Sequence, residues 1–424
     1  MDFKDTAAEA AFRNEVRAWL DANAQRRQHA EEKFGAGLSP QEYLAAAKAW
    51  QARKADAGYA AIAWPKAVGG RDGTPIQQVI YQQEEADCLV PQGVFTVGMG
   101  MALPTVMMWG TPAQQARYLP SGLAGDEIWC QLFSEPVAGS DTGGIRTRAQ
   151  RRGDGWVIDG QKVWSSNAHC SDWGILLARS DWDKPRTKGL TMFLLDMKSP
   201  GVEVRPIHQM SGECEFNEVF LTDVRIPDSL RLGGEGEGWN VMLSTLMHER
   251  LSVGGAFPVD LHRRLIALAR QCRWDGKPAV EDARVRARIA DAYLSQRGVD
   301  LIVMRGLTAL SRGGMPGPEM AVTKLVAGKG IQDICSFAQE MAGAEGLLPA
   351  EELDAQWQHI RWMWLMAPGM RLGGGTDEIL RNVIAERVLG LPSEVRTDKD
   401  VPFRELEGVG MSRKSPQEPP AGNP

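Results

Sequence analysis

The sequence predicts an α+β protein with an N-terminal helical domain (1–125), a middle antiparallel β-barrel or sandwich domain (126–235) and a C-terminal helical bundle (236–393). Apolar residues recur at helical intervals in the first region, short β-rich runs alternate with turns in the second, and helical periodicity returns from Gly238. Because no helical pattern of about 10 residues separates the β-rich runs, an antiparallel barrel or sandwich is favoured over a doubly wound sheet.

The N-terminal region is rich in Ala, Glu, Arg and Lys, with apolar residues at helical spacing. Its predicted helices cover residues 7–23, 40–57, 76–89 and 112–120. Ser39-Pro40 marks the start of the second helix, because proline is favoured in the first turn.

The middle region contains short runs of β-branched, aromatic and other apolar residues. Predicted strands include residues 156–158, 175–178, 190–197, 202–206 and 218–221. Asp159-Gly160 is a strong two-residue turn signal, so a β-hairpin is predicted with its second arm at 161–164.

Long helical periodicity is typical of the C-terminal region, which is therefore predicted to form a bundle. The periodic segments cover residues 238–271, 281–312, 318–342 and 376–389. The pattern stops after Pro392, and the Pro-rich composition of 394–424 predicts a mobile tail that buries little surface.

The bulk composition excludes several classes of protein. The chain has 424 residues, 43% of them hydrophobic, and a formal net charge of −6, which argues against nonspecific nucleic-acid binding. No run is long enough to span a membrane, and the N-terminus lacks a signal region. The six cysteines show neither CxxC nor Cys/His metal spacing, which indicates thiols in a reducing cytoplasm and no bound metal.

A candidate ligand site lies in residues 130–174. The small and polar segment 134–141 follows a strand-like run and can bring backbone N–H groups close to a flat or anionic ligand. Trp164 is followed by Ser165 and Ser166, so an aromatic ligand can rest on the indole and bond to a hydroxyl. No GxGxxG follows a strand, which argues against a Rossmann dinucleotide domain.

Three motifs carry a resemblance to the flavoprotein acyl-CoA dehydrogenases. They are Ser-Glu-Pro-x-Ala-Gly-Ser-Asp at 134–141, Asp-Gly-Gln-Lys-x-Trp-Ser-Ser at 159–166 and the run from Gly374 to Pro392. The resemblance covers roughly residues 5–393. It implies FAD in the cleft between β-domain and bundle, oxidation of an acyl-CoA to a trans-2-enoyl-CoA, and an electron-transfer flavoprotein as acceptor.

The same resemblance assigns roles to individual residues. Positions that contact FAD in the family are occupied here by Phe133, Ser134, Gly139, Ser140, Trp164, Ser166, Arg273, Thr376 and Glu378. Ser140 also lies at the flavin–substrate edge, and Arg250 matches a position near the CoA nucleotide. Many members have Gln where this chain has Glu378, so this contact departs from the family pattern.

The catalytic base also departs from the commonest pattern. Many members carry it in Tyr-Glu-Gly-Thr, where this chain has Gly373-Gly374-Gly375-Thr376. A minority place the Glu on a helix before an Arg, and Glu249-Arg250 resembles that site. Met242, Leu246 and Glu249 share one helical face, and a carboxylate on an apolar stripe suits a general base. The alternative is that Glu249 pairs with a basic residue at a domain seam.

Two departures concern the subunit interface. The family's Arg-x-x-Phe-Gly segment, which reaches the neighbouring subunit's FAD, is Cys272-Arg273-Trp274-Asp275-Gly276 here. Glu340 occupies the position of a pyrophosphate-binding Gln, with Gln339 beside it. Either Arg273 and Gln339 substitute through a shifted register in a homodimer or homotetramer, or a related subunit completes a hetero-oligomer. Another flavin oxidation (nitroalkane oxidase or monooxygenase type) and a non-catalytic subunit are the alternative functions.

Overall fold

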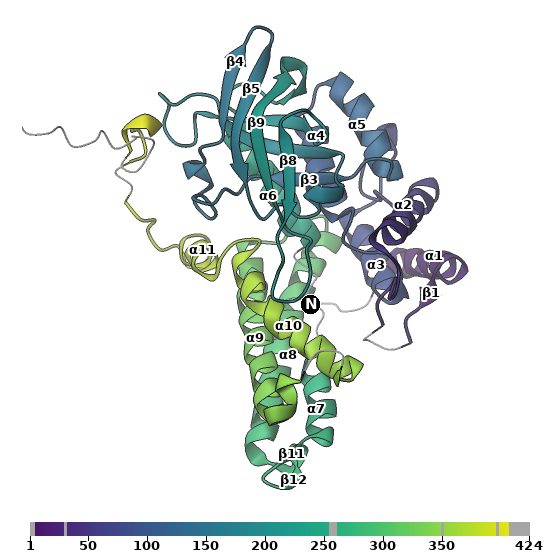
Figure 1. Cartoon of the computed structure of the whole chain (residues 1–424). Helices are drawn as coiled ribbons and strands as arrows, with labels where there is room; N and C mark the ends of the chain where they lie inside the picture. Colours follow the sequence, from purple (N-terminus) through teal and green to yellow (C-terminus); the bar gives the residue numbers. More distant parts are fainter. Residues whose placement is uncertain (1–4, 29–31, 254–260, 349–351, 396–397, 407–424) are drawn as a thin grey trace, which may run out of the picture.

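The computed structural model describes residues 5–28, 32–253, 261–348, 352–395 and 398–406 (Figure 1). Within these ranges an N-terminal group of helices and a β-sheet form one body, and a bundle of long helices extends from it (Figure 1). The predicted fold class is confirmed. No helix in the described ranges is both long and apolar enough to cross a bilayer.

The described residues of the N-terminal region form five α-helices: α1 (Ala7–Asn23), α2 (Pro40–Asp56), α3 (Pro75–Ala86), α4 (Leu103–Trp109) and α5 (Pro112–Ala124). Capping boxes start α1, α2, α3 and α5, which explains why the sequence locates these starts well.

Three details of this region differ from the sequence prediction. Helix α3 ends at Ala86, because the next residues form strand β2 (Cys88–Leu89), which pairs with β1 (Gln25–Arg26). Helix α5 continues through Pro120, since burial of neighbouring side chains outweighs the lost backbone hydrogen bond. The π-helix η2 (Gly98–Ala102) and α4 were not predicted.

The middle region forms a sheet of eight strands: β3 (Trp129–Leu132), β4 (Arg148–Arg152), β5 (Gly155–Lys162), β6 (Trp173–Arg179), β7 (Leu190–Asp196), β8 (Val202–Pro206), β9 (Asn217–Pro227) and β10 (Arg231–Leu232). The order is β10-β7-β6-β4-β5-β9-β8, with β3 beside β6. Most pairs are antiparallel, but β3 and β4 pair with β6 in parallel, so the sheet is mixed.

The predicted hairpin at Asp159-Gly160 is wrong. Strand β5 runs without interruption through both residues, with a bulge where it pairs with β9. Gly160 is required by a close approach instead: a Cβ there would lie 2.5 Å from Thr147 Oγ1. The actual β4–β5 turn is at Gly153, whose φ is +60°.

The C-terminal region contains α6 (Gly238–Val253), α7 (Leu261–Gln271), α8 (Ala283–Ser311), α9 (Ala321–Ala342), α10 (Ala355–Leu372) and α11 (Asp377–Val383). The predicted segment 238–271 is therefore two helices. Helix α10 was not predicted, because Pro368 and Gly369 lie inside it and are normally helix breakers. It is held by burial of Ile360 and Met363 in the core of the bundle.

The described part of the C-terminal tail contradicts the expectation that 394–424 buries little. Phe403 is 1% exposed, and its backbone N–H donates to the Lys184 carbonyl at 3.0 Å. Its ring lies 3.4 Å from the Arg179 guanidinium, a buried cation that donates to the Gly143 and Ile145 carbonyls. Residues 398–406 therefore pack on the β-domain, whereas 407–424 lie outside the described residues.

Replacing Phe403 with Ala is expected to destabilise the protein by about 3–5 kcal/mol, because it removes a buried ring and leaves a cavity over Arg179. The measurement is the denaturant midpoint of unfolding. Val395→Ala is the matched control, since Val395 is 88% exposed, and should leave the midpoint unchanged. Equal midpoints for both variants would contradict the packing described.

Candidate active site

A buried ion pair organises the segment that leads to the candidate flavin site. Lys162, at the end of β5, donates to Glu135 Oε1 at 2.8 Å and to the Phe133 carbonyl at 3.0 Å. Glu135 also accepts from the backbone N–H groups of Arg146 and Thr147. Burial alone would raise the pKa of Glu135, but the Lys162 charge and these hydrogen bonds hold it below its usual range. The pair fixes segment 133–147 against the sheet.

This arrangement limits what Phe133 and Ser134 can offer a flavin. The Phe133 carbonyl is taken by Lys162, and the Ser134 carbonyl accepts from the Val163 N–H at 2.9 Å. Both carbonyls are therefore already engaged in hydrogen bonds within the chain. Ser134 therefore lies beside Val163, in the segment that leads to Trp164.

Trp164 is held in an unusual conformation at the end of β5. Its φ is +60°, which is costly for a bulky residue, and 58% of its surface is exposed. The Phe216 ring meets the indole edge-on at 5.9 Å, and the Ser165 N–H donates to the Asn217 carbonyl. An exposed indole held rigidly in this way suits stacking or edge contact with a flat ligand.

The segment predicted to lie at the flavin–substrate edge forms a turn. Glu135 and Ala138 exchange backbone hydrogen bonds at 3.0 Å, so Gly139 and Ser140 follow a tight loop and are exposed. A Cβ on Gly139 would meet nothing within 4 Å, which leaves open space for a ligand. Asp141 forms an ion pair with Arg186, which also binds Asp398 of the tail segment.

Helix α6 carries Glu249 and Arg250, whose side chains lie outside the described part of the structure. The preceding turns of the same face are described. Met242 is buried and Leu246 half-buried in a core that includes Phe133, Trp129 and Leu103. The helix packs on η2 and α4, so this face of α6 is covered by the N-terminal region.

The start of α11 forms the second part of the predicted FAD site. Gly374 and Gly375 have φ values of +65° and +97°, a left-handed backbone that glycine adopts readily. Thr376 caps the helix by accepting from the Ile379 N–H, so its hydroxyl proton remains available to donate. Glu378 is exposed and lies 3.9 Å from Arg381. Helix α11 lies at the end of the bundle nearest the β-domain (Figure 1).

The structure does not bring Arg273 to the other predicted FAD contacts of its own chain. Arg273 lies in the small hairpin β11–β12 (Arg273–Trp274 and Lys277–Pro278), at the far end of the bundle (Figure 1). Its guanidinium donates to the Gly276 carbonyl at 3.2 Å. Gln339 is half-buried on α9, and Glu340 beside it is exposed.

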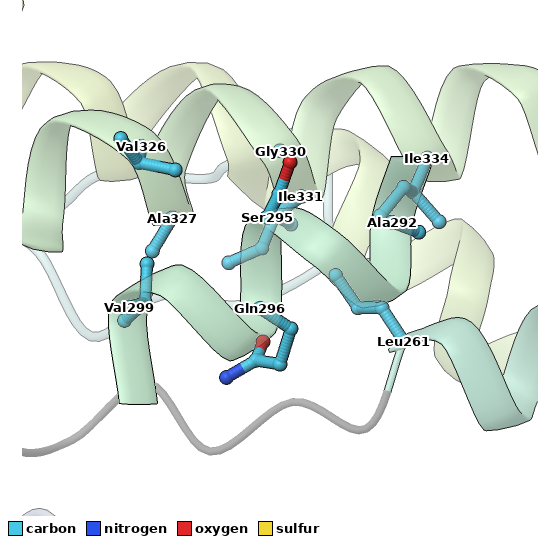
Figure 2. A pocket seen from close by; sticks show the side chains of 10 residues that line it. All are labelled: Leu261, Ala292, Ser295, Gln296, Val299, Val326, Ala327, Gly330, Ile331 and Ile334. Atoms are coloured by element: carbon cyan, nitrogen blue, oxygen red, sulfur yellow. The ribbon is translucent and has the colours of Figure 1, made fainter. Parts of the chain in front are cut away.

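A separate pocket in the bundle is lined mostly by aliphatic side chains. It lies between α7, α8 and α9, and its lining is aliphatic except for Ser295 and Gln296 (Figure 2). Among the described residues no acid, base or aromatic ring lines it, so it is not the candidate site.

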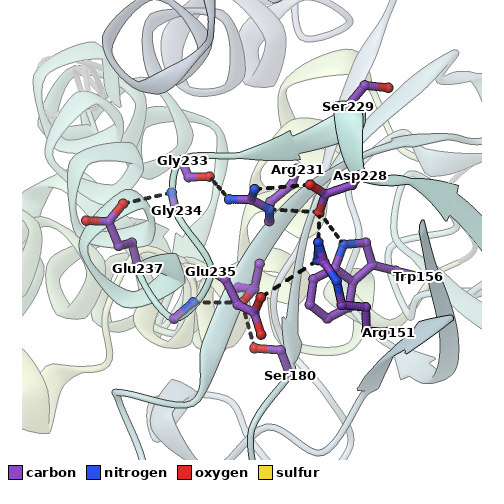
Figure 3. A network of polar contacts seen from close by, with 12 residues as sticks. Arg151, Trp156, Ser180, Asp228, Ser229, Arg231, Gly233, Gly234, Glu235 and Glu237 are labelled. Atoms are coloured by element: carbon purple, nitrogen blue, oxygen red, sulfur yellow. Dashed lines mark hydrogen bonds and ion pairs between the residues drawn. The ribbon is translucent and has the colours of Figure 1, made fainter. Parts of the chain in front are cut away.

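A polar network fixes the linker that leads into α6. Asp228 accepts from Trp156 Nε1 at 2.7 Å and from Arg231 at 3.0 Å, and Arg231 also donates to the Gly233 carbonyl (Figure 3). At the start of α6, a Cβ on Gly238 would lie 2.7 Å from the backbone of β7. The first turn of α6 is therefore set directly against the sheet.

Asp228 gives a test with a defined pH dependence. Hydrogen bonds from Arg231 and Trp156 lower the pKa of Asp228 from 3.8 to about 2. Because the folded pKa lies below the ordinary value, its stabilisation is present above about pH 4 and is lost as pH falls toward 2. Asp228→Asn should cost about 1–2 kcal/mol at pH 7, and this difference should shrink below pH 4. Asp223→Asn, an exposed carboxylate on the preceding strand β9, is the control; a pH-independent difference would contradict the assignment.

Comparison with known proteins identifies the family. Models of the acyl-CoA dehydrogenase N-terminal, middle and C-terminal domains match residues 6–126, 130–224 and 236–389. Acyl-CoA dehydrogenase IpdE1 of Mycobacterium tuberculosis is 36% identical over 395 residues, which covers 91% of this chain and 98% of IpdE1. This chain belongs to the acyl-CoA dehydrogenase family. FadE34 of the same organism is also 36% identical, over 89% of this chain but only 52% of FadE34.

Solved structures of acyl-CoA dehydrogenases agree with this assignment. The Tcur3481–Tcur3483 steroid ACAD has a TM-score of 0.75 and 27% identity, covering 93% of this chain and 100% of that chain. The ChsE4–ChsE5 complex of M. tuberculosis has a TM-score of 0.75 and 25% identity over the same shares. The protein is therefore an acyl-CoA dehydrogenase, a flavoprotein oxidoreductase that uses FAD.

The acyl-CoA dehydrogenase site fits a flavin. Trp164 presents a fixed, exposed indole, Gly139 leaves open space, and Thr376 retains a hydroxyl proton. The sequence analysis missed the groups that hold these residues in place, above all Lys162 and Glu135. Both lie within the recognised motifs, and a charged pair in a β-rich segment was the available signal.

Proposed function

We propose that this acyl-CoA dehydrogenase oxidises the CoA thioester of a bulky, ring-bearing acyl group to the trans-2-enoyl-CoA, with Glu249 as the general base. The observation that carries the proposal is the packing of α6. Its Met242–Leu246 face lies against η2, α4 and the core around Phe133. Glu249 follows Leu246 by three positions, so helix geometry directs it to the same face.

The proposed chemistry divides between protein and cofactor. Glu249 takes the proton from the carbon next to the thioester carbonyl as general base. Bound FAD supplies the acceptor for the hydride from the neighbouring carbon. Arg250 binds the CoA nucleotide, and an electron-transfer flavoprotein takes the electrons onward.

Two observations support a bulky acyl group. Gly373 and Gly374 provide no side chains where many relatives have Tyr and Glu, which would leave room beside a bound flavin. A solved structure at 27% identity is described as a steroid ACAD. We therefore propose a steroid-derived thioester as the substrate class.

The test is anaerobic bleaching of the flavin by butyryl-CoA, octanoyl-CoA and cholan-24-oyl-CoA, with nitroethane as a non-thioester control. Bleaching by cholan-24-oyl-CoA at the lowest concentration is expected. Preference for butyryl-CoA would overturn the substrate class. Bleaching by nitroethane and by no thioester would overturn the reaction.

We also propose that the enzyme works as a hetero-oligomer with a related subunit. Asp275 and Glu340 occupy family positions for contact with a neighbour's FAD, and both side chains are exposed, so they would repel a pyrophosphate. Two similar structures are named for pairs of chains, Tcur3481–Tcur3483 and ChsE4–ChsE5. Native mass spectrometry of the enzyme purified from its own cells should show a second chain. A homodimer or homotetramer with one FAD per chain would overturn this proposal.

A further inference from the structure

Two hydrogen bonds join α4 to α6 in the turn before Glu249. Thr105 Oγ1 lies 3.0 Å from Thr245 Oγ1, and both side chains are fully buried. Trp109 Nε1 donates to Ser244 Oγ at 3.0 Å. We call these four residues the α4–α6 clamp.

The proton arrangement of the clamp is defined by its neighbours. Thr245 donates to the Val241 carbonyl and Ser244 to the Asn240 carbonyl, so both oxygens act as acceptors across the seam. Thr105 then shares its proton between the Met101 carbonyl, at 2.7 Å, and Thr245. Met101 belongs to η2, so the clamp also ties the π-helix to α6.

The stability of the fold does not explain the Thr105–Thr245 bond. Its surroundings are apolar, with Leu103, Val106, Val241 and Met242 all buried. Replacing both partners of such a bond with apolar groups of the same shape is nearly neutral. A buried hydrogen bond in an apolar contact instead selects one register between the two helices, because sliding one helix along the other leaves a hydroxyl without its partner.

The clamp is well placed to fix the position of Glu249. Thr105 and Trp109 are four residues apart, on one face of α4, and they hold two consecutive residues of α6. Hydrogen bonds at two points restrict both the rotation of α6 about its axis and its translation along α4. Glu249 follows Thr245 by four residues, about 6 Å along the axis on the same face.

We infer that the α4–α6 clamp sets the reach of Glu249 toward the substrate, and that Thr245 is a positioning residue for proton abstraction. This inference rests on the proposed function of Glu249. A displacement of about 1 Å of a reacting group can cost about 100-fold in rate. Loss of the clamp therefore slows chemistry while it leaves folding and substrate affinity largely intact.

The experiment compares Thr245→Val with Thr245→Ser. The probe is the CoA ester among butyryl, octanoyl and cholan-24-oyl that bleaches the wild-type enzyme fastest. Stopped-flow reduction at saturating ester should be about 10–100-fold slower in Thr245→Val, with Kd, FAD content and melting temperature close to wild type. Thr245→Ser keeps the hydroxyl and should recover most of the rate.

Two further variants sharpen the test. Thr105→Val/Thr245→Val should be no slower than Thr245→Val, because both remove the same bond. Thr323→Val is the matched control, a buried threonine on α9 that bonds the Met320 carbonyl, and should reduce at the wild-type rate.

The outcomes separate this inference from the proposed function. A wild-type reduction rate in Thr245→Val, or a rate loss that Thr245→Ser does not recover, overturns the inference. Normal reduction of Glu249→Gln overturns the proposed function instead. Loss of reduction in Glu249→Gln with a wild-type rate in Thr245→Val overturns the inference alone.

Discussion

Replacing Glu249 with Gln is expected to slow flavin reduction by acyl-CoA about 10²–10⁴-fold, the usual contribution of a general base. The amide has nearly the same shape but cannot accept the proton at neutral pH. FAD content should be unchanged, because the predicted flavin contacts lie in the segments that follow β3 and β5, on β11 and at the start of α11 rather than on α6. The measurement is anaerobic stopped-flow bleaching, together with the FAD-to-protein ratio.

The control is Asp333→Asn, which neutralises a carboxylate on α9 that pairs with Lys329. Flavin reduction in this variant should proceed at the wild-type rate. Glu249→Asp should retain part of the activity, because it keeps the base but shortens its reach. Undiminished reduction in Glu249→Gln would contradict the assignment of Glu249 as the base. Because residues 373–375 are glycines and offer no side-chain carboxylate, another residue would have to accept the proton.

Local signals were sufficient to predict most of the helices and strands. Helices α1, α2, α3 and α5 begin at Thr or Ser caps, so their starts are encoded within a few residues. The β-rich runs fall in strands because their apolar and β-branched residues build the two faces of the sheet.

The errors arise where a distant contact outweighs a local signal. Asp159-Gly160 has the composition of a turn, yet Gly160 is needed because Thr147 approaches it closely. A proline normally ends a helix, but α10 continues through Pro368 because it packs on α9. Phe403 lies in a polar tail and is buried by Arg179, a residue more than 200 positions away.

The same distinction between local signals and distant contacts applies to the candidate site. The motifs single out Ser134, Trp164 and Thr376 as candidate residues, because short sequences specify their backbone turns. The polar groups that hold them were not found from sequence. Lys162 and Glu135 are 27 positions apart and meet only when β5 lies beside the segment after β3.

Lys162→Met is expected to have the second-largest effect, on folding and FAD retention rather than on a chemical step. It leaves the Glu135 carboxylate buried beside Phe133 with no cation, which typically costs about 3–5 kcal/mol. Segment 133–147 should loosen, so FAD should be lost more readily during gel filtration. The denaturant midpoint and the FAD-to-protein ratio measure the two effects.

The stability of Lys162→Met should change with pH in the opposite direction to that of the wild type. In the wild type Lys162 holds the pKa of Glu135 down, so the pair stabilises the fold above the ordinary carboxyl pKa and loses this as pH falls. Without Lys162, burial outweighs the remaining hydrogen bonds from the Arg146 and Thr147 N–H groups and raises that pKa, so the variant should retain FAD better at pH 5.5 than at pH 8. Lys162→Met/Glu135→Gln removes the buried charge and should recover much of the lost stability. If the double variant is no more stable than Lys162→Met, or if the single variant matches wild type, the ion pair does not hold the flavin segment.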